Sequence, residues 1–266
     1  MGRAVINSPG MQLRYGAVTD LGKVRARNED RYVADGELGF FAVVDGMGGH
    51  TGGELASATI AEAITSFIRE TAGDSDKTWP VGLDARLSIL ANRLQVAIRS
   101  ANRTLATRAQ TDSALDGSGA TLVAALFGGD QLAVSNVGDC RAYLLRAGRL
   151  LQLTRDHSVV AEQVAQGLID SEAARTHPLR HVVTRAVSGQ PGMRVDIREL
   201  AVKPGDRVIL CSDGIHGVLT DNEIADLMSA SGRPLDELCQ AVIQEANARG
   251  GPDNATAVVI EVADGS

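Results

Sequence analysis

The hydrophobic pattern of this chain consists of short apolar runs separated by turns rich in Gly and Asp. Such runs, bounded by turn residues, are typical of buried strands. Strands are expected at residues 13–18, 40–44, 120–127, 131–137, 141–146, 149–153, 194–202, 207–211 and 255–262. Helical spacing of apolar residues, three and four apart, occurs over 54–70, 83–108, 158–166, 220–229 and 234–249. Two pairs of strands flank short Gly-containing turns, so we expect hairpins at 120–137 and 141–153.

Two segments fall outside this pattern. Residues 1–10 read as a loose leader, and residues 154–193 are polar and broken, with several Arg and His. A long segment without strong structure is often functional. We therefore expect a single domain over 1–266, with a mobile flap over 154–193 beside its site.

Composition narrows the classes of protein that fit. The chain has 266 residues, 44% hydrophobic residues and a net charge of −7, which argues against a nucleic-acid-binding surface. Its three Cys are widely spaced, so no disulfide framework or zinc pattern follows, and a reducing compartment is expected. No signal peptide or membrane-length apolar run is present in this sequence. We expect a monomeric cytoplasmic protein without a membrane segment.

Acidic residues stand at the ends of several expected strands. Asp45, Asp139 and Asp213 each follow an apolar run, and Asp253 precedes the last one. One such acid is usually a turn residue, but four on the same pattern point to a shared role. Clusters of carboxylates suit hard cations such as Mg²⁺ or Mn²⁺, and without a cation they would repel one another. No His or Cys shares this spacing, which argues against zinc.

Two further stretches carry candidate chemistry. The segment 46–53 holds five Gly in eight residues directly after Asp45, which lets the backbone approach a ligand closely. The segment 23–32, KVRARNEDRY, brings Arg25, Glu29 and Asp30 close together. Adjacent residues of a strand point to opposite faces, so only one of the two acids can aim directly at a given ligand. The other could act through water.

Seven motifs occur in an order that resembles a known family. They are RARNEDRY, FAVVDGMGGH, GSGATLVAAL, NVGDCRAYLLR, LTRDHS, CSDGI and GGPDNATAVV, and they cover about residues 13–262. This set resembles the bacterial branch of the metal-dependent type 2C protein serine/threonine phosphatases, the PPM family. The resemblance implies an α+β fold, with two mainly antiparallel sheets flanked by helices in four α/β/β/α layers. It also implies hydrolysis of phosphoserine and phosphothreonine by a water or hydroxide bridging two divalent metals.

The resemblance assigns roles to individual residues. Asp45 would bridge two Mn²⁺ or Mg²⁺ ions. Asp213 and Asp253 would complete the ligands of one metal, and Glu29 and the Gly46 carbonyl would complete those of the other. Asp30 would hold a metal-bound water. The remaining roles are phosphate binding by Arg25 and a third, weaker metal held by Asp139 with Asp213. The implied partners are phosphorylated proteins, substrates of a serine/threonine kinase.

The sequence departs from the family at two positions. Cys140 stands where the family usually has Ser, and Met47 stands where the eukaryotic branch has His. The general acid is therefore open, with His50 or a metal-bound water as candidates.

Three other classes remain for comparison. Cys140 and Arg146 have the spacing of a thiol phosphatase loop, but the residues between them read as a strand. A dinucleotide-binding loop would need Gly at position 51, which is Thr51. A catalytically weak regulatory or binding member of the same fold stays as the alternative.

Overall fold

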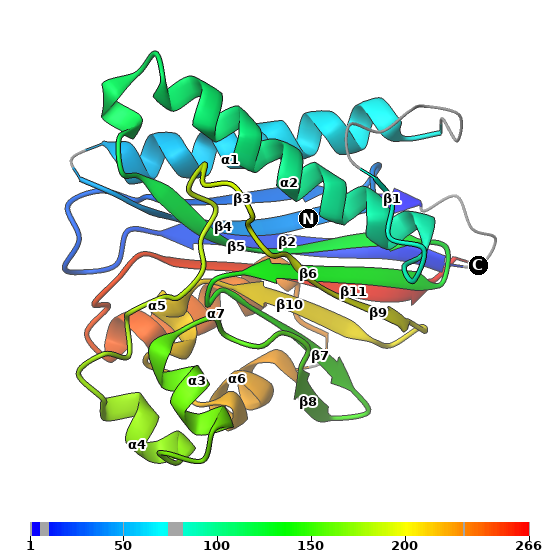
Figure 1. Ribbon diagram of the computed structural model, residues 1–266. Coiled ribbons are helices and arrows are strands. Elements are labelled where there is room, and N and C mark those ends of the chain that lie inside the picture. The colour runs from blue at the N-terminus through cyan, green and yellow to red at the C-terminus, as the bar shows by residue number, and fades with distance from the viewer. Residues whose placement is uncertain (1, 6–10, 50, 74–81, 231, 266) are drawn as a thin grey trace.

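Four layers make up the fold seen in the computed structural model, which describes residues 2–5, 11–49, 51–73, 82–230 and 232–265. Figure 1 shows two helices above a pair of stacked sheets and further helices below them. The expected α/β/β/α sandwich is thus confirmed.

The two sheets differ in size. One has the order β3-β4-β5-β6-β9, formed by Asp30–Asp35, Phe40–Met47, Gly119–Gly128, Gln131–Val137 and Asp196–Ala201. The other has the order β1-β2-β11-β10-β7-β8, formed by Gly2–Val5, Met11–Asp20, Ala255–Asp264, Arg207–Cys211, Arg141–Arg146 and Arg149–Gln152. Every strand pair among the described residues is antiparallel. Both expected hairpins, β5–β6 and β7–β8, are confirmed.

Helices cover the outer faces of both sheets. Helices α1 (Gly52–Thr71) and α2 (Ile89–Ala109) lie on the five-stranded sheet. Helices α5 (Asp213–His216), α6 (Asp221–Met228) and α7 (Leu235–Ala248) lie on the other side of the sandwich. Three apolar clusters separate the layers: one under α1 and α2, one between the sheets and one under α5–α7.

The continuous apolar run of β4 follows from its place in these layers. Phe40, Ala42 and Val44 pack toward α1 and α2, whereas Phe41 and Val43 pack between the sheets. Successive side chains of a strand point to opposite faces, and here both faces are buried. The strand can therefore carry a polar side chain only near its end, and Asp45 is the third residue from that end.

Several expected boundaries are wrong, and β4 runs to Met47 instead of ending at residue 44. The loose leader is partly a strand, because β1 pairs with β2 from Gly2↔Tyr15 to Val5↔Gln12. Helix α1 begins at Gly52 instead of Glu54. Helix α2 begins at Ile89 instead of residue 83, because the Ser88 side chain caps it by accepting a hydrogen bond from Ala91 N.

The segment 154–193 lies beside α5 and α6 and carries two short helices (Figure 1). They are α3 (Val159–Ala165), near the expected position, and α4 (Ser171–Thr176). Isolated bridges join this segment to the rest of the chain at Val187 and to itself at Val183. In the part of the chain that the structure describes, no helix is both long and apolar enough to cross a membrane.

Candidate active site

Ends of strands from both sheets meet at one cavity of about 760 Å³. Asp45 lies near the end of β4, Asp213 opens α5 just after β10, and Asp253 lies just before β11. Six of the seven predicted site side chains, all but Asp30, line this cavity together with Gly46. These six are Arg25, Glu29, Asp45, Asp139, Asp213 and Asp253. The strand-end pattern thus converges in space although the acids lie far apart in sequence.

Asp45 occupies the centre of this group. It is the cross-strand partner of Asp30 on β3 and of Thr121 on β5. Burial raises the pKa of Asp45 well above its usual value, and the carboxylates of Asp30, Asp213, Asp139 and Asp253 raise it further. Five carboxylates this close repel one another unless a cation balances their negative charge. The grouping therefore indicates a cation site.

Asp30 is held by hydroxyl groups from the opposite sheet. Its Oδ2 accepts hydrogen bonds from Ser212 Oγ at 2.8 Å and from Thr256 Oγ1 at 2.6 Å. Burial raises the Asp30 pKa to about 6, although these two hydrogen bonds lower it. Its Oδ1 is buried and has no hydrogen-bond partner. Such an atom normally finds a partner, so Oδ1 indicates a group that completes the site.

Two acids of the site pair with basic side chains. Arg25 donates from Nη2 to Asp253 Oδ2 at 2.7 Å, and His181 Nδ1 lies 3.9 Å from Asp213 Oδ2. Burial would raise the Asp213 pKa, but His181, His216 and Arg25 hold it below its usual value. Within the described ranges, no three acidic, His or Cys side chains already converge as a finished metal-ligand set. In this arrangement the basic side chains offset part of the charge of the acids.

Glu29 and Gly46 are fixed by close backbone packing. Gly46 N donates to Glu29 O at 3.2 Å, and a Cβ at position 46 would collide with the Gly53 carbonyl at the start of α1. Only Gly fits this contact. Burial raises the pKa of Glu29, which lies beside Arg25.

Asp139 lies in the loop between β6 and β7, where Gly138 has a φ of 108°. Gly138 N donates to His157 Nδ1 at 3.0 Å, and the Asp139 carbonyl contacts His216 Nε2 at 3.0 Å. Burial raises the Asp139 pKa to about 7, with Asp213 and Asp156 adding to the effect. The loop is therefore anchored on both sides of the acid.

Asn254 was not among the predicted site residues, yet it holds the loop that carries them. Its Oδ1 accepts from Glu29 N, and its Nδ2 donates to the carbonyls of Leu21 and Arg27, each at 2.9 Å. The motif GGPDNATAVV contains this Asn and also Thr256, so the motif was a signal for both. His181 was missed as well, because it comes from a segment without a clear pattern. His50, a candidate general acid, lies outside the described residues.

The residues fit a site for hard divalent cations. All donors are oxygens, the central acid lies among other carboxylates, and Asp30 Oδ1 lacks a partner. Cations there would replace Arg25 and His181 as counter-charges to Asp253 and Asp213. The thiols do not compete for this role, because Cys140, Cys211 and Cys239 are all buried. Burial also raises the pKa of each of them, which keeps the thiols protonated.

Comparison with known proteins agrees with this class of site. The sequence profile of protein phosphatase 2C matches residues 23–257. The chain belongs to the protein phosphatase 2C family.

Individual relatives cover most of the chain. It is 36% identical over 253 residues to the serine/threonine protein phosphatase PstP of Mycobacterium tuberculosis, covering 95% of this chain and 45% of PstP. It is 33% identical to the serine/threonine phosphatase stp of Listeria welshimeri, covering 91% of this chain and 93% of that protein. The chain therefore spans less than half the length of PstP.

A solved structure resembles the fold closely. The crystal structure of the catalytic domain of PstP, in complex with two manganese ions, superposes with a TM-score of 0.81 at 35% identity. The match covers 96% of this chain and all of that domain.

Proposed function

We propose that this protein is a metal-dependent protein serine/threonine phosphatase. The observation that carries the proposal is the cavity in which Asp45 lies among four other carboxylates while Asp30 Oδ1 lacks a partner. Family membership and the two manganese ions of the PstP catalytic domain support the same reaction.

The lining of the cavity supports a proposal for the metal ligands. Two Mn²⁺ or Mg²⁺ ions, when bound, would neutralise phosphate charge and lower the pKa of the attacking water. The residues that would hold them are Glu29, Asp45, Asp213 and Asp253, with the Gly46 carbonyl. Asp139, together with Asp213, would hold a third and weaker ion.

Other side chains act on substrate and water directly. Arg25 would leave Asp253 and bind phosphate oxygens through its two parallel N–H groups. Asp30 has one oxygen fixed by Ser212 and Thr256, so its other oxygen is free to accept a hydrogen bond from the attacking water. The water attacks phosphorus as the ester P–O bond breaks, and the serine or threonine alcohol leaves with a proton.

The test is hydrolysis of p-nitrophenyl phosphate and of a phosphothreonine peptide with and without Mn²⁺. We expect activity on both substrates with Mn²⁺ and none in EDTA, restored by excess Mn²⁺. Full activity in EDTA would falsify the metal mechanism. A protein that binds Mn²⁺ and phosphopeptide without turnover would instead favour the second candidate, a regulatory member of the same fold.

The biological setting is part of the proposal. The substrates would be proteins phosphorylated by a serine/threonine kinase, since PstP and stp carry the name serine/threonine phosphatase. We place the protein in the cytoplasm as a monomer, where its three buried free thiols stay reduced.

A further inference from the structure

A second cavity, of about 770 Å³, opens beside the active site. It lies between the segment 154–193 and helices α5 and α6, and we call it the flap cavity. Asp139, Arg180, His181, Asp213 and Gly217 line both cavities, so the two are continuous. Its volume is in the range of ligand-binding pockets. A substrate polypeptide that extends from the active site in this direction would enter the flap cavity.

One wall of the flap cavity is apolar and is only partly covered by the described part of the fold. Val160, Ala161, Val164 and Ala165 lie on one face of α3 and line the cavity. None of them belongs to the three apolar clusters formed by the described residues. Val160 is buried, but Val164 is half-buried and Ala165 is exposed, so the C-terminal part of this face remains available to an apolar side chain from elsewhere.

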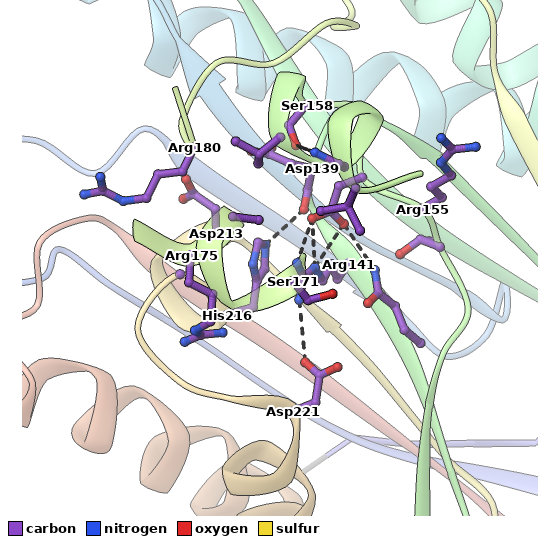
Figure 2. Close-up of a pocket in the computed structure, with 18 of the residues that line it drawn as sticks. Asp139, Arg141, Arg155, Ser158, Ser171, Arg175, Arg180, Asp213, His216 and Asp221 are labelled. Atoms are coloured by element: carbon purple, nitrogen blue, oxygen red, sulfur yellow. Dashed lines mark hydrogen bonds and ion pairs between the residues drawn. The ribbon is translucent and has the colours of Figure 1, made fainter. Parts of the chain in front are cut away.

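The floor of the flap cavity is charged, but its charges are already paired. Arg141 donates to both carboxylate oxygens of Asp156, at 2.9 Å and 2.7 Å, and its Nη1 lies 3.5 Å from Asp221 Oδ1. Gln152 also donates to Asp156. Figure 2 shows Arg141 and Asp221 of this network below Asp139. These paired side chains form a rigid floor, and few of their charges remain available to bind a ligand.

The unpaired charges of the flap cavity are mostly positive. Among the described residues, no carboxylate pairs with Arg155, Arg175 or Arg180, which all line the cavity. Figure 2 shows Arg175 and Arg180 on the same side as Asp213. Glu172 is the one unpaired acid on these walls outside the active site. A ligand with an acidic group next to an apolar group matches this lining.

We propose that the flap cavity binds the substrate chain next to the phosphorylated residue, with an apolar side chain against α3 and an acidic one at Arg175. The inference rests on the proposed phosphatase function and gives it a substrate class. Continuity with the active site favours substrate over a free small molecule, because the phosphoester and its neighbours then bind in adjoining spaces.

The experiment compares phosphothreonine peptides in which one neighbour of the phosphothreonine at a time is Gly, Leu, Glu or Lys. At the preferred positions we expect kcat/KM for Leu or Glu about fivefold above Gly, and Lys below it. The Glu preference should weaken in high salt, whereas the Leu preference should persist. p-Nitrophenyl phosphate has no neighbouring residues and reports on the chemistry alone.

Two variants test the two parts separately. Arg175→Glu should reverse the preference from Glu to Lys, and Ala165→Trp should remove the preference for Leu. Arg149→Glu and Gln166→Trp are the matched controls, because both residues are exposed and neither lines the cavity. Both controls should keep the wild-type preferences.

The outcomes separate the inference from the function on which it rests. Metal-dependent turnover of p-nitrophenyl phosphate with equal rates on all peptides refutes the subsite and leaves the phosphatase intact. A variant that slows every substrate by one factor also refutes the subsite. A protein inactive on all substrates with Mn²⁺ refutes the phosphatase and the subsite together.

Discussion

Replacing Asn254 with Ala should destabilise the protein and loosen its metal site together. The side chain is 6% exposed and makes three hydrogen bonds to the loop 21–29. Each buried hydrogen bond contributes roughly 1 kcal/mol, and the orphaned groups of the loop add a desolvation penalty unless water reaches them. We therefore expect a loss of about 3 kcal/mol in the free energy of unfolding. For a chain of this size, that loss lowers the melting temperature by about 6–12 °C.

The assay is urea and thermal denaturation of the metal-free protein, followed by calorimetric titration with Mn²⁺. Glu29 and Arg25 lie on the loop that Asn254 holds, so the variant should bind Mn²⁺ more weakly and show a raised KM for phosphopeptide. Asn254→Asp keeps the acceptor for Glu29 N but loses both donors, so it should be intermediate in stability. Asn222→Ala is the control, because Asn222 is exposed.

A loss below about 1 kcal/mol would contradict the role of Asn254 as the anchor of the loop. Lower stability with unchanged Mn²⁺ affinity and KM would show that the loop keeps its position without the anchor. That result would refute the coupling between the loop and the metal site.

Three further predictions concern the acids and thiols of the site. Cys140→Ser should keep turnover within about 100-fold, or about 2.7 kcal/mol of barrier, because the thiol is buried and contacts Thr121 Oγ1 at 3.2 Å; a larger loss would overturn the view that no thiol is catalytic. Asp139→Ala should keep two tight metals by calorimetry but lose about 10²–10⁴-fold in turnover of phosphothreonine peptide, with a smaller loss on p-nitrophenyl phosphate. An equal loss on both substrates, or loss of the tight metals, would contradict a third-metal role. The metal-free protein should lose about 1 kcal/mol of stability from pH 6.5 to 8, because the folded state holds a proton on Asp139, with a pKa of about 7, that the unfolded chain has already released. The raised pKa of Asp45 acts in the same direction. Bound Mn²⁺ should abolish this pH dependence of stability, measured by urea denaturation. An unchanged pH dependence would refute its assignment to these acids. Below pH 6.5 the buried His216, with its pKa lowered by burial to about 4, contributes the opposite slope.

Most strands, and the acids at their ends, were predictable from sequence because each depends on a local pattern, whereas the four layers were implied by the resemblance to a known family. The run ending at Asp45 is apolar on both faces, which only a strand between two packed layers requires. The same pattern at Asp213 and Asp253 identified strand ends, and antiparallel pairing brought those ends to one edge.

Other features depend on contacts that no local pattern encodes. Asn254 reaches a loop more than two hundred positions away in the chain. His181 approaches Asp213 from a segment with little regular structure. The apolar spacing from residue 83 predicted an earlier start for α2. The helix instead begins after Ser88, because the Ser88 side chain caps it there. The strand β1 was missed because its pairing with β2 decides its conformation.

The pairing of β2 with β11 joins the first long strand of the chain to its last one. During synthesis a ribosome releases β2 long before β11. The loop with Arg25 and Glu29 therefore lacks its contacts with Asp253 and Asn254 until β11 is reached. A nascent chain that ends before β11 lacks one acid of the cavity and the anchor of the loop. Long-range pairing of this kind also makes folding slow. The candidate site is therefore incomplete until β11 has been synthesised, and its acids come together only after that step.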